Sequence, residues 1–167
     1  DVSTYVKKAI AISVPLDLDT SWSVISRSSN WIYSYRFLRS LKQKVRVKSR
    51  TIKLPNFDKL EQIKNIREFD NWITGPLHGF KDAADYYSQN SSIHFISSIK
   101  TPTLIVNAKN DPFLSKECFP VGINTGNIEY LYPDYGGHVG FTLFNKNNLY
   151  WSEIMAIKFI AGKDFTK

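Results

Sequence analysis

The pattern of apolar positions along the chain predicts three strands. The segment from Lys7 to Pro15 contains a short apolar run of small and β-branched residues closed by a proline, which is typical of a strand buried on both faces. The segment from Thr101 to Ala108 repeats this pattern, with a proline before the run and polar residues after it. Asn127 to Pro133 alternates more between apolar and polar positions, which favours a strand near a sheet edge.

Apolar residues at three- and four-residue spacing predict helices between and after these strands. The predicted helices span residues 28–44, 57–72, 82–87 and 149–160. Gly75-Pro76 is expected to stop the second helix, and Gly162 is expected to mark the end of the last one.

The order of these elements predicts an α/β fold. A strand, a long helical insertion, and then strand, helix, strand and helix is the order of a parallel sheet with crossover helices. Parallel sheets are normally covered on both faces and contain more than three strands. The chain is therefore expected to form part of a larger α/β domain.

Composition indicates a single core and excludes several classes of protein. The 167 residues are 43% hydrophobic and 14% aromatic, which suits one globular core. No run approaches the roughly 18 apolar residues that a transmembrane helix needs. Cys118 is the single cysteine, which excludes an intramolecular disulfide and a cysteine zinc site, and a cytoplasmic location fits this composition best.

The net charge of +7 is concentrated in one region. Nine basic residues and no acidic one lie between Asp19 and Asp58. A solvated helix face followed by a basic loop explains such a run without any binding function. Attraction to an anionic substrate, a membrane surface or nucleic acid is the alternative. Both interpretations stay open when charge is considered alone.

Two loops that follow predicted strands carry candidate catalytic residues. Asp111 lies a few residues after the second strand, and His138 follows Gly136-Gly137 after the third. Reactive groups of open parallel sheets gather past the carboxyl ends of the strands, so adjacent strands would bring this carboxylate and imidazole together. An aspartate that accepts the ring N–H of a histidine prepares the imidazole to act as general base for a serine nucleophile.

Each of these residues alone also has a purely structural interpretation. Asp111 precedes a proline, as turn residues often do, and His138 can be satisfied by backbone groups of its loop. His78 is predicted to pack on Phe80 or, alternatively, to shape a substrate entrance, and His94 is predicted to be structural. No metal-binding histidine spacing and no phosphate-binding glycine loop occurs, so neither a metal site nor a cofactor is expected.

Six short motifs occur in an order that matches a known family. They are AISVPLDL at 11–18, REFD at 67–70, GF at 79–80 with DYY at 85–87, PTLI at 102–105, NDPF at 110–113 and GGHVGF at 136–141. Together they resemble the YheT-like branch of the α/β-hydrolase fold over nearly the whole chain. The resemblance implies a serine hydrolase of esterase or lipase type, in which Asp111 matches the triad acid and His138 matches the triad base.

The chain departs from this family in one respect. The family's nucleophile lies in a G-x-S-x-G turn between a strand and a helix, and no such motif occurs in the 167 residues. No oxyanion-hole loop is evident. Ser13 and Ser115 are not interpreted as nucleophiles, because each is expected to be a strand-end or helix-cap hydroxyl. The resemblance therefore implies that residues 1–167 are the C-terminal portion of one α/β-hydrolase domain. Residues 16–90 would form a helical cap, and residues 1–15 and 91–167 the sheet core.

Three functional hypotheses follow. The leading one is the acid- and base-bearing part of a carboxylic ester hydrolase, inactive alone, whose substrate is a small-molecule ester or lipid. The aromatic and basic residues of its cap either pack between cap and core or contact a membrane surface. The second is a non-catalytic fragment that forms a homodimer through the strand at Lys8–Val14 or associates with the missing half of the domain, because that strand would lie at an unpaired edge. The third, a basic nucleic-acid-binding module, rests on charge alone, so no nucleic-acid partner is expected.

Overall fold

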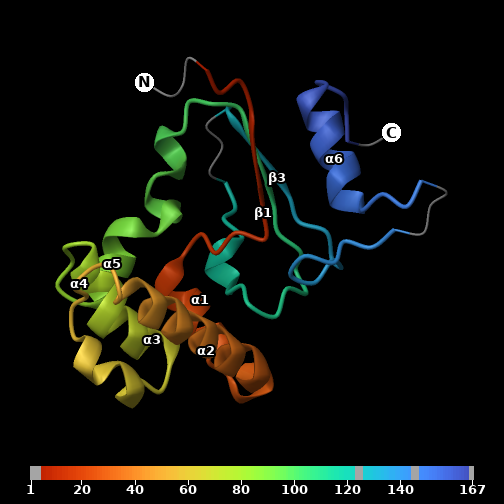
Figure 1. Cartoon of the computed structure of the whole chain (residues 1–167). Coiled ribbons are helices and arrows are strands. Elements are labelled where there is room, and N and C mark those ends of the chain that lie inside the picture. Colours follow the sequence, from red (N-terminus) through yellow and green to blue (C-terminus); the bar gives the residue numbers. More distant parts are fainter. Residues whose placement is uncertain (1–4, 123–125, 144–146, 166–167) are drawn as a thin grey trace. The chain divides into compact units, whose positions relative to one another are not determined.

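The chain folds into two compact units, which are described separately. The structure is a computed structural model, and it describes residues 5–122, 126–143 and 147–165. One unit combines Asp1–Leu16 with Ser92–Lys167, and the other is Asp17–Ser91. The first unit contains the strands and the second contains most of the helices (Figure 1).

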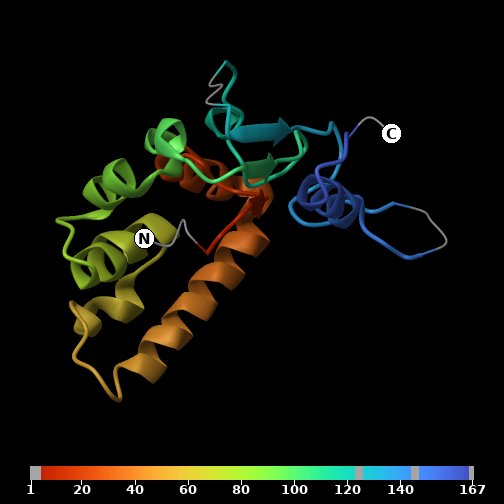
Figure 2. The ribbon, with the colours of Figure 1, turned by 90° about the horizontal axis from the view of Figure 1, so that it is seen from above.

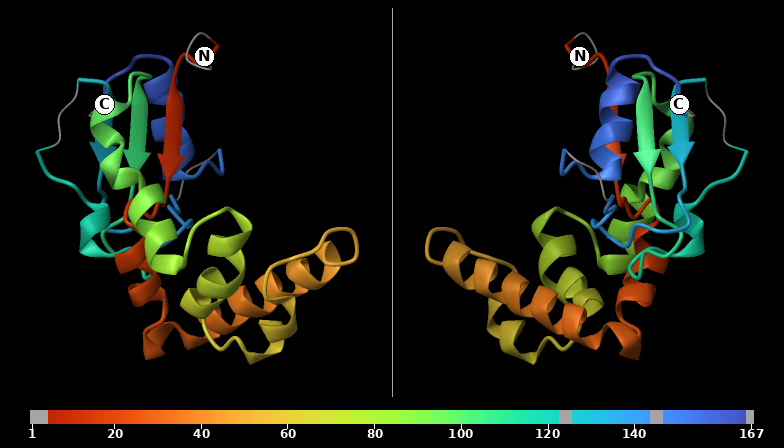
Figure 3. Two further views of the ribbon diagram at one scale, coloured as in Figure 1. Left: turned by 90° about the vertical axis from the view of Figure 1, so that its left-hand side faces the viewer. Right: turned by 90° about the vertical axis from the view of Figure 1, so that its right-hand side faces the viewer.

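The first unit is built on a three-stranded parallel sheet. The strands are β1 (Ala9–Ile12), β2 (Thr103–Val106) and β3 (Ile128–Leu131), in the spatial order β1-β2-β3. Ala9 pairs with Thr103, and Thr103 pairs with Ile128, so the three strands begin and end at the same level. Figure 3 shows the three arrows running in one direction. The predicted α/β class with three parallel strands is confirmed.

The central strand β2 is buried on both faces, and its side chains alternate between two apolar clusters. Leu104 and Val106 pack in a cluster with Phe159 of helix α6 (Trp151–Ile160). Ile105 packs on the opposite face with residues of the 3₁₀ helices Ile96–Ser98 and Lys116–Cys118. The two coverings lie on opposite sides of the sheet in Figure 3. This alternation places the core of the unit around β2.

Strand β1 differs from its prediction, because it is not buried on both faces. Its residues are half-buried, and Ile12 is 39% exposed. The reason is its place at one edge of the three-stranded sheet, where only β2 pairs with it among the described residues. Lys8 precedes β1 and donates hydrogen bonds to the Phe159 and Ile160 carbonyls at the end of α6, where a cation is favourable.

Asn107 ties the carboxyl end of β1 to the carboxyl end of β2. It follows β2 directly and is fully buried. Its side-chain oxygen accepts from Val14 N at 2.8 Å, and its Nδ2 donates to the carbonyls of Val14 at 3.1 Å and Cys118 at 2.9 Å. The backbone pairing of β1 with β2 ends at Ile12, and beyond it the hydrogen bonds of the buried Asn107 amide hold the two chain segments together.

The second unit is helical. Its helices are α1 (Leu18–Ile25), α2 (Trp31–Lys48), α3 (Ile66–Phe69), α4 (Gly75–Leu77) and α5 (Ala83–Asn90). The long helix α2 is seen along most of its length in Figure 2. Its buried Val45 packs with Leu54, Leu60 and Phe69, which form the core of this unit with Ile63 and Ile73. The predicted helices at 28–44 and 82–87 are confirmed with small shifts of their ends.

The predicted single helix over 57–72 is wrong. The segment consists of a 3₁₀ helix at Phe57–Gln62, an extended residue at Ile63, helix α3, and a π-helical turn at Asp70–Thr74. Gly75-Pro76 was expected to end the helix, but these two residues are the first two of α4. A side chain at Gly75 would meet the Asp70 and Asp82 carbonyl oxygens at 3.0 Å, so the close approach of these backbones requires glycine.

A half-buried carboxylate lies in this π-helical turn. Asp70 Oδ2 accepts a 2.6 Å hydrogen bond from the Tyr87 hydroxyl, and the Arg67 guanidinium lies 5.8 Å from the Tyr87 ring centroid. Burial raises the pKa of the Asp70 carboxyl, although its hydrogen bonds with Thr74 and Tyr87 act in the opposite direction. Burial and the neighbouring Asp70 raise the pKa of the Tyr87 hydroxyl.

No helix in the described part of the chain is long and apolar enough to cross a membrane.

We expect Asn107→Leu to destabilise the first unit by about 3 kcal/mol, because it removes the three hydrogen bonds that the fully buried Asn107 amide makes with the Val14 N–H and with the carbonyls of Val14 and Cys118. The free energy of unfolding in urea measures the effect. The matched control is Asn127→Leu, which removes one 3.3 Å bond to the Ile99 carbonyl from a half-buried position and should cost less than about 1 kcal/mol. Equal losses in the two variants would contradict the role assigned to Asn107.

We expect the stability difference between Asp70→Asn and the parent chain to grow in favour of the variant as the pH rises from about 4 to 7. A carboxyl whose pKa is raised by folding binds its proton more tightly in the folded state, so it lowers stability progressively above its unfolded pKa of 3.8. The amide has no charge to bury at any pH. Urea unfolding at several pH values measures the difference, and a flat or falling difference would contradict the burial of this carboxylate.

Candidate active site

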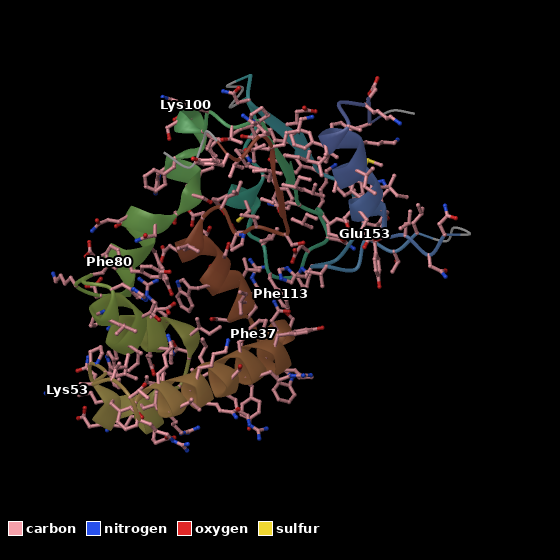
Figure 4. The ribbon with its side chains drawn as sticks, turned by 45° about the horizontal axis from the view of Figure 1, so that its top comes forward. Phe37, Lys53, Phe80, Lys100, Phe113 and Glu153 are labelled. Atoms are coloured by element: carbon pink, nitrogen blue, oxygen red, sulfur yellow. The ribbon has the colours of Figure 1, made fainter. Side chains whose placement is uncertain are left out.

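Asp111 is positioned by a tight turn after β2. Its backbone N–H donates to the Ala108 carbonyl at 3.0 Å, and its Oδ1 accepts from Phe113 N at 2.9 Å. An aspartate that binds its own backbone two residues on stabilises such a turn locally. The side chain of Asp111 is completely shielded from solvent. This turn, Lys109–Phe113, is called the acid loop below; it contains Phe113, which is labelled in Figure 4.

His138 lies in a loop after β3 that glycines make possible. This segment, Asp134–Phe141, is called the His loop below. A side chain at Gly136 would meet the Phe141 ring at 2.6 Å and the Ala108 Cβ at 2.8 Å, and Gly137 has a φ of 59°. Phe141 N donates to the Gly136 carbonyl at 2.9 Å and closes the loop, and the buried Phe141 side chain anchors it in the core.

The structure brings the two predicted site residues together. His138 Nδ1 lies 2.9 Å from Asp111 Oδ2, and the Phe113 and His138 rings pack edge to face with centroids 4.7 Å apart. An ionised carboxylate only accepts hydrogen bonds, so Nδ1 carries the proton and Nε2 has a free lone pair. The acid loop and the His loop thus set both the tautomer and the plane of the ring.

The remaining side of the imidazole is accessible. The His138 side chain is 36% exposed, whereas the Asp111 side chain is buried behind it. Among the residues that the structure describes, no hydroxyl or thiol hydrogen-bonds to the His138 ring. Ser13 binds the His138 backbone carbonyl through its hydroxyl, so it is not placed to be activated by the ring. The arrangement can accept a proton from an outside group at Nε2.

A cavity of about 390 Å³ lies beside the His loop, but it does not contain the pair. Its lining includes Gly136, Gly137, Phe141 and Trp151, and neither Asp111 nor His138. It is therefore not assigned to the chemistry of these two residues.

The other two histidines are exposed and lie on other elements. His78 is exposed at the end of α4, and the ring that contacts Phe80 is Tyr86 at 5.4 Å. His94 is exposed in the 3₁₀ helix Ser92–His94. No group of three histidine, cysteine or acidic side chains suited to a metal ion occurs in the described ranges.

Sequence reasoning missed three polar residues that support the site: Asn107, Asn110 and the hydroxyl of Ser13. Asn110 Oδ1 accepts from Gly136 N at 3.0 Å and from Gly137 N at 2.9 Å. An asparagine after a strand is an ordinary turn residue by composition, so no local signal distinguishes these roles. The available hint was the occurrence of two asparagines, at 107 and 110, in the four residues before Asp111.

The basic run lies mainly on α2 and the turn after it. Arg46 forms an exposed ion pair with Glu61 at 2.7 Å, which accounts for one of its nine charges. Trp31 and Tyr35 on the same helix are 65% and 61% exposed. The predicted membrane contact of this region stays a prediction.

Comparison with known proteins gives relatives of one class. No family model and no solved structure matches the chain. The chain is 34% identical over 141 residues to the candidate esterase YheT of Escherichia coli, covering 81% of this chain and 41% of that protein. It is 32% identical over 148 residues to the monoacylglycerol lipase of Saccharomyces cerevisiae, covering 83% of this chain and 33% of that protein.

A third relative extends the range of named activities. The medium-chain fatty acid ethyl ester synthase/esterase 2 of Saccharomyces cerevisiae is 34% identical over 111 residues, which are 65% of this chain and 24% of that protein. The chain thus spans about two-fifths or less of the length of these curated relatives. With its parallel sheet and these similarities, the chain belongs to the YheT-like branch of the α/β-hydrolase superfamily.

Proposed function

We propose that this chain supplies the acid and the base of a serine hydrolase that acts on carboxylic esters. The observation that supports the proposal is the 2.9 Å contact between His138 Nδ1 and Asp111 Oδ2, past the carboxyl ends of β3 and β2. In an open parallel sheet this is where reactive groups gather. The names of the relatives, which include an esterase and a lipase, support the same reaction class.

In this proposal His138 acts as general base and then as general acid. Its Nε2 removes the proton of a serine hydroxyl while the oxygen attacks the ester carbonyl, and it then protonates the leaving alkoxide. Asp111 accepts the Nδ1–H throughout and stabilises the imidazolium. No G-x-S-x-G motif occurs in the 167 residues, so in this proposal the nucleophilic serine and the oxyanion donors come from outside them, and the chain alone does not turn over esters.

The proposed substrates are esters of fatty acids, in keeping with the lipase and the ethyl ester esterase among the relatives. The exposed aromatic and basic side chains of α2 are suited to an anionic lipid surface, because aromatic rings and lysine or arginine side chains favour the interface of such a surface. This contact is the partner proposed for the helical unit.

We expect activity when the chain replaces the matching segment, 41% of the length, of the Escherichia coli relative in a chimeric protein. His138→Ala should lower kcat for p-nitrophenyl esters by about 10³-fold or more, and Asp111→Asn by a similar factor, because the base and its tautomer are lost. The matched control is His94→Ala, an exposed histidine of the same unit, which should leave kcat unchanged. The 167-residue chain alone should show no turnover that depends on His138.

Two results would contradict this proposal. One is an active, folded chimera in which His138→Ala has no more effect than His94→Ala. The other is ester hydrolysis by the 167-residue chain alone that His138→Ala abolishes, which would mean that the chain carries its own nucleophile.

A second candidate function is self-association through β1. The sequence predicts that this strand, at Lys8–Val14, pairs with a second copy of the chain. Only one side of β1 is paired among the described residues, and Ile12 is 39% exposed at this edge. Edge strands with free N–H and C=O groups accept a further strand, and a second copy in antiparallel orientation would give a symmetric dimer.

We expect Ile12→Lys to convert such a dimer to a monomer at micromolar concentration, because a charge on an edge strand opposes pairing with a second copy. Sedimentation velocity measures the change. Val121→Lys is the matched control, because Val121 is 93% exposed in the same unit and lies outside the sheet. A monomeric parent chain, or a dimer that both substitutions leave intact, would overturn pairing through β1.

A further inference from the structure

We propose that Asn110 and Ser13 are positioning residues for His138, which bind the backbone of the His loop and so set the place of its imidazole. The inference rests on the proposed function for its catalytic meaning, because positioning matters only if His138 is the base. Its structural part concerns contacts within one unit of the chain and can be measured without any activity.

Asn110 connects the acid loop to the start of the His loop. Its single Oδ1 atom accepts from two successive backbone N–H groups, those of Gly136 at 3.0 Å and Gly137 at 2.9 Å. Asn110 directly precedes Asp111, whose carboxylate binds the His138 ring. Of these two consecutive residues, Asn110 binds the backbone just before His138, and Asp111 binds the ring of His138.

Ser13 makes a second contact with the same loop. Its hydroxyl donates to the His138 backbone carbonyl. Ser13 is buried and has a φ of 56°, a left-handed conformation that a non-glycine residue keeps only where its surroundings impose it. The Asn107 bonds to Val14, the next residue, fix the chain at this point. The hydroxyl is therefore presented to the His loop by a rigid segment.

The His loop needs such contacts because of its composition. Glycine occupies positions 136, 137 and 140, and glycine loses more conformational freedom on ordering than any other residue. The bond from Phe141 N to the Gly136 carbonyl closes the loop but does not fix the backbone of His138 within it. The Asn110 bonds precede His138 and the Ser13 bond is made to His138 itself, so together they restrict that residue.

A further contact between the acid loop and the His loop offers a control. Lys109 forms an ion pair with Asp134 at 2.7 Å, and both side chains are more than half exposed. Exposed ion pairs contribute little, and this one does not involve residues 136–138. Lys109→Ala therefore removes a contact between the same two loops without removing the contacts to the residues that carry the proposal.

The first test measures the state of the His138 ring by nitrogen-15 and proton NMR of the 167-residue chain at a pH where the ring is neutral. The chain has three histidines, so His138→Ala identifies the signals. The parent chain should show one tautomer with the proton on Nδ1. Asn110→Ala and Ser13→Gly should lower the share of this tautomer and speed exchange of the Nδ1 proton by about 10-fold or more, through local opening of the loop.

Two variants separate positioning from general loss of structure. Asn110→Asp keeps an oxygen that accepts both glycine N–H groups, so it should retain the parent tautomer and slow exchange. Ser13→Gly removes the hydroxyl but suits the left-handed backbone, so it should fold as the parent does. The inference is overturned if Asn110→Ala and Ser13→Gly keep the parent signals, as Lys109→Ala should, or if Asn110→Asp loses them as fully as Asn110→Ala.

The second test uses the chimeric enzyme described above. Asn110→Ala should lower kcat by about 10- to 100-fold with KM changed by less than about twofold, because a displaced base affects the chemical step more than binding. Lys109→Ala should change neither value. An inactive but folded unsubstituted chimera would count against the proposed function alone, and the NMR result would still decide whether Asn110 and Ser13 position His138. Equal kcat values in Asn110→Ala and the parent chimera would overturn the catalytic part of the inference.

Discussion

The parallel pairing of β2 with β3 is the constraint on which the candidate site depends. Asp111 and His138 are 27 residues apart in the sequence, and their side chains meet because both strands end at the same level of the sheet. An antiparallel arrangement would have sent the two loops to opposite ends. The register is in turn fixed by burial of β2 on both faces, since a shift by one residue would exchange the side chains between its two apolar clusters.

Beyond the last paired residues of the strands, hydrogen bonds from polar side chains hold the chain in place of strand pairing. Asn107 joins the ends of β1 and β2 through buried bonds, and Asn110 joins the acid loop to the His loop. Backbone groups just past a strand have lost their ladder partners, and an asparagine side chain offers both a donor and an acceptor in their place. These side-chain bonds thereby extend the order of the parallel sheet to the candidate pair, Asp111 and His138.

The sequence predicted those features that depend on local pattern. The apolar runs at β1, β2 and β3, the periodicity of α6 and the placement of Asp111 and His138 after strands were sufficient for the fold class and for the candidate pair. The 57–72 segment was misjudged because its apolar spacing is helical, while the extended residue at Ile63 and the close approach at Gly75 are imposed by tertiary packing. The roles of Asn107, Asn110 and Ser13 depend on partners 93, 27 and 125 residues away, which no local window contains.

The candidate pair is already ordered in this chain without a nucleophile among the described residues. The Asp111 carboxylate is held by the Phe113 N–H, the His138 ring by that carboxylate and the Phe113 ring, and the His138 backbone by Ser13. All of these groups belong to one compact unit. A serine from elsewhere in the fold would therefore meet an imidazole whose tautomer and plane are set in advance. In the proposed reaction, the entropy of orienting the base would then be lost when this unit folds, so the catalytic step would not bear it.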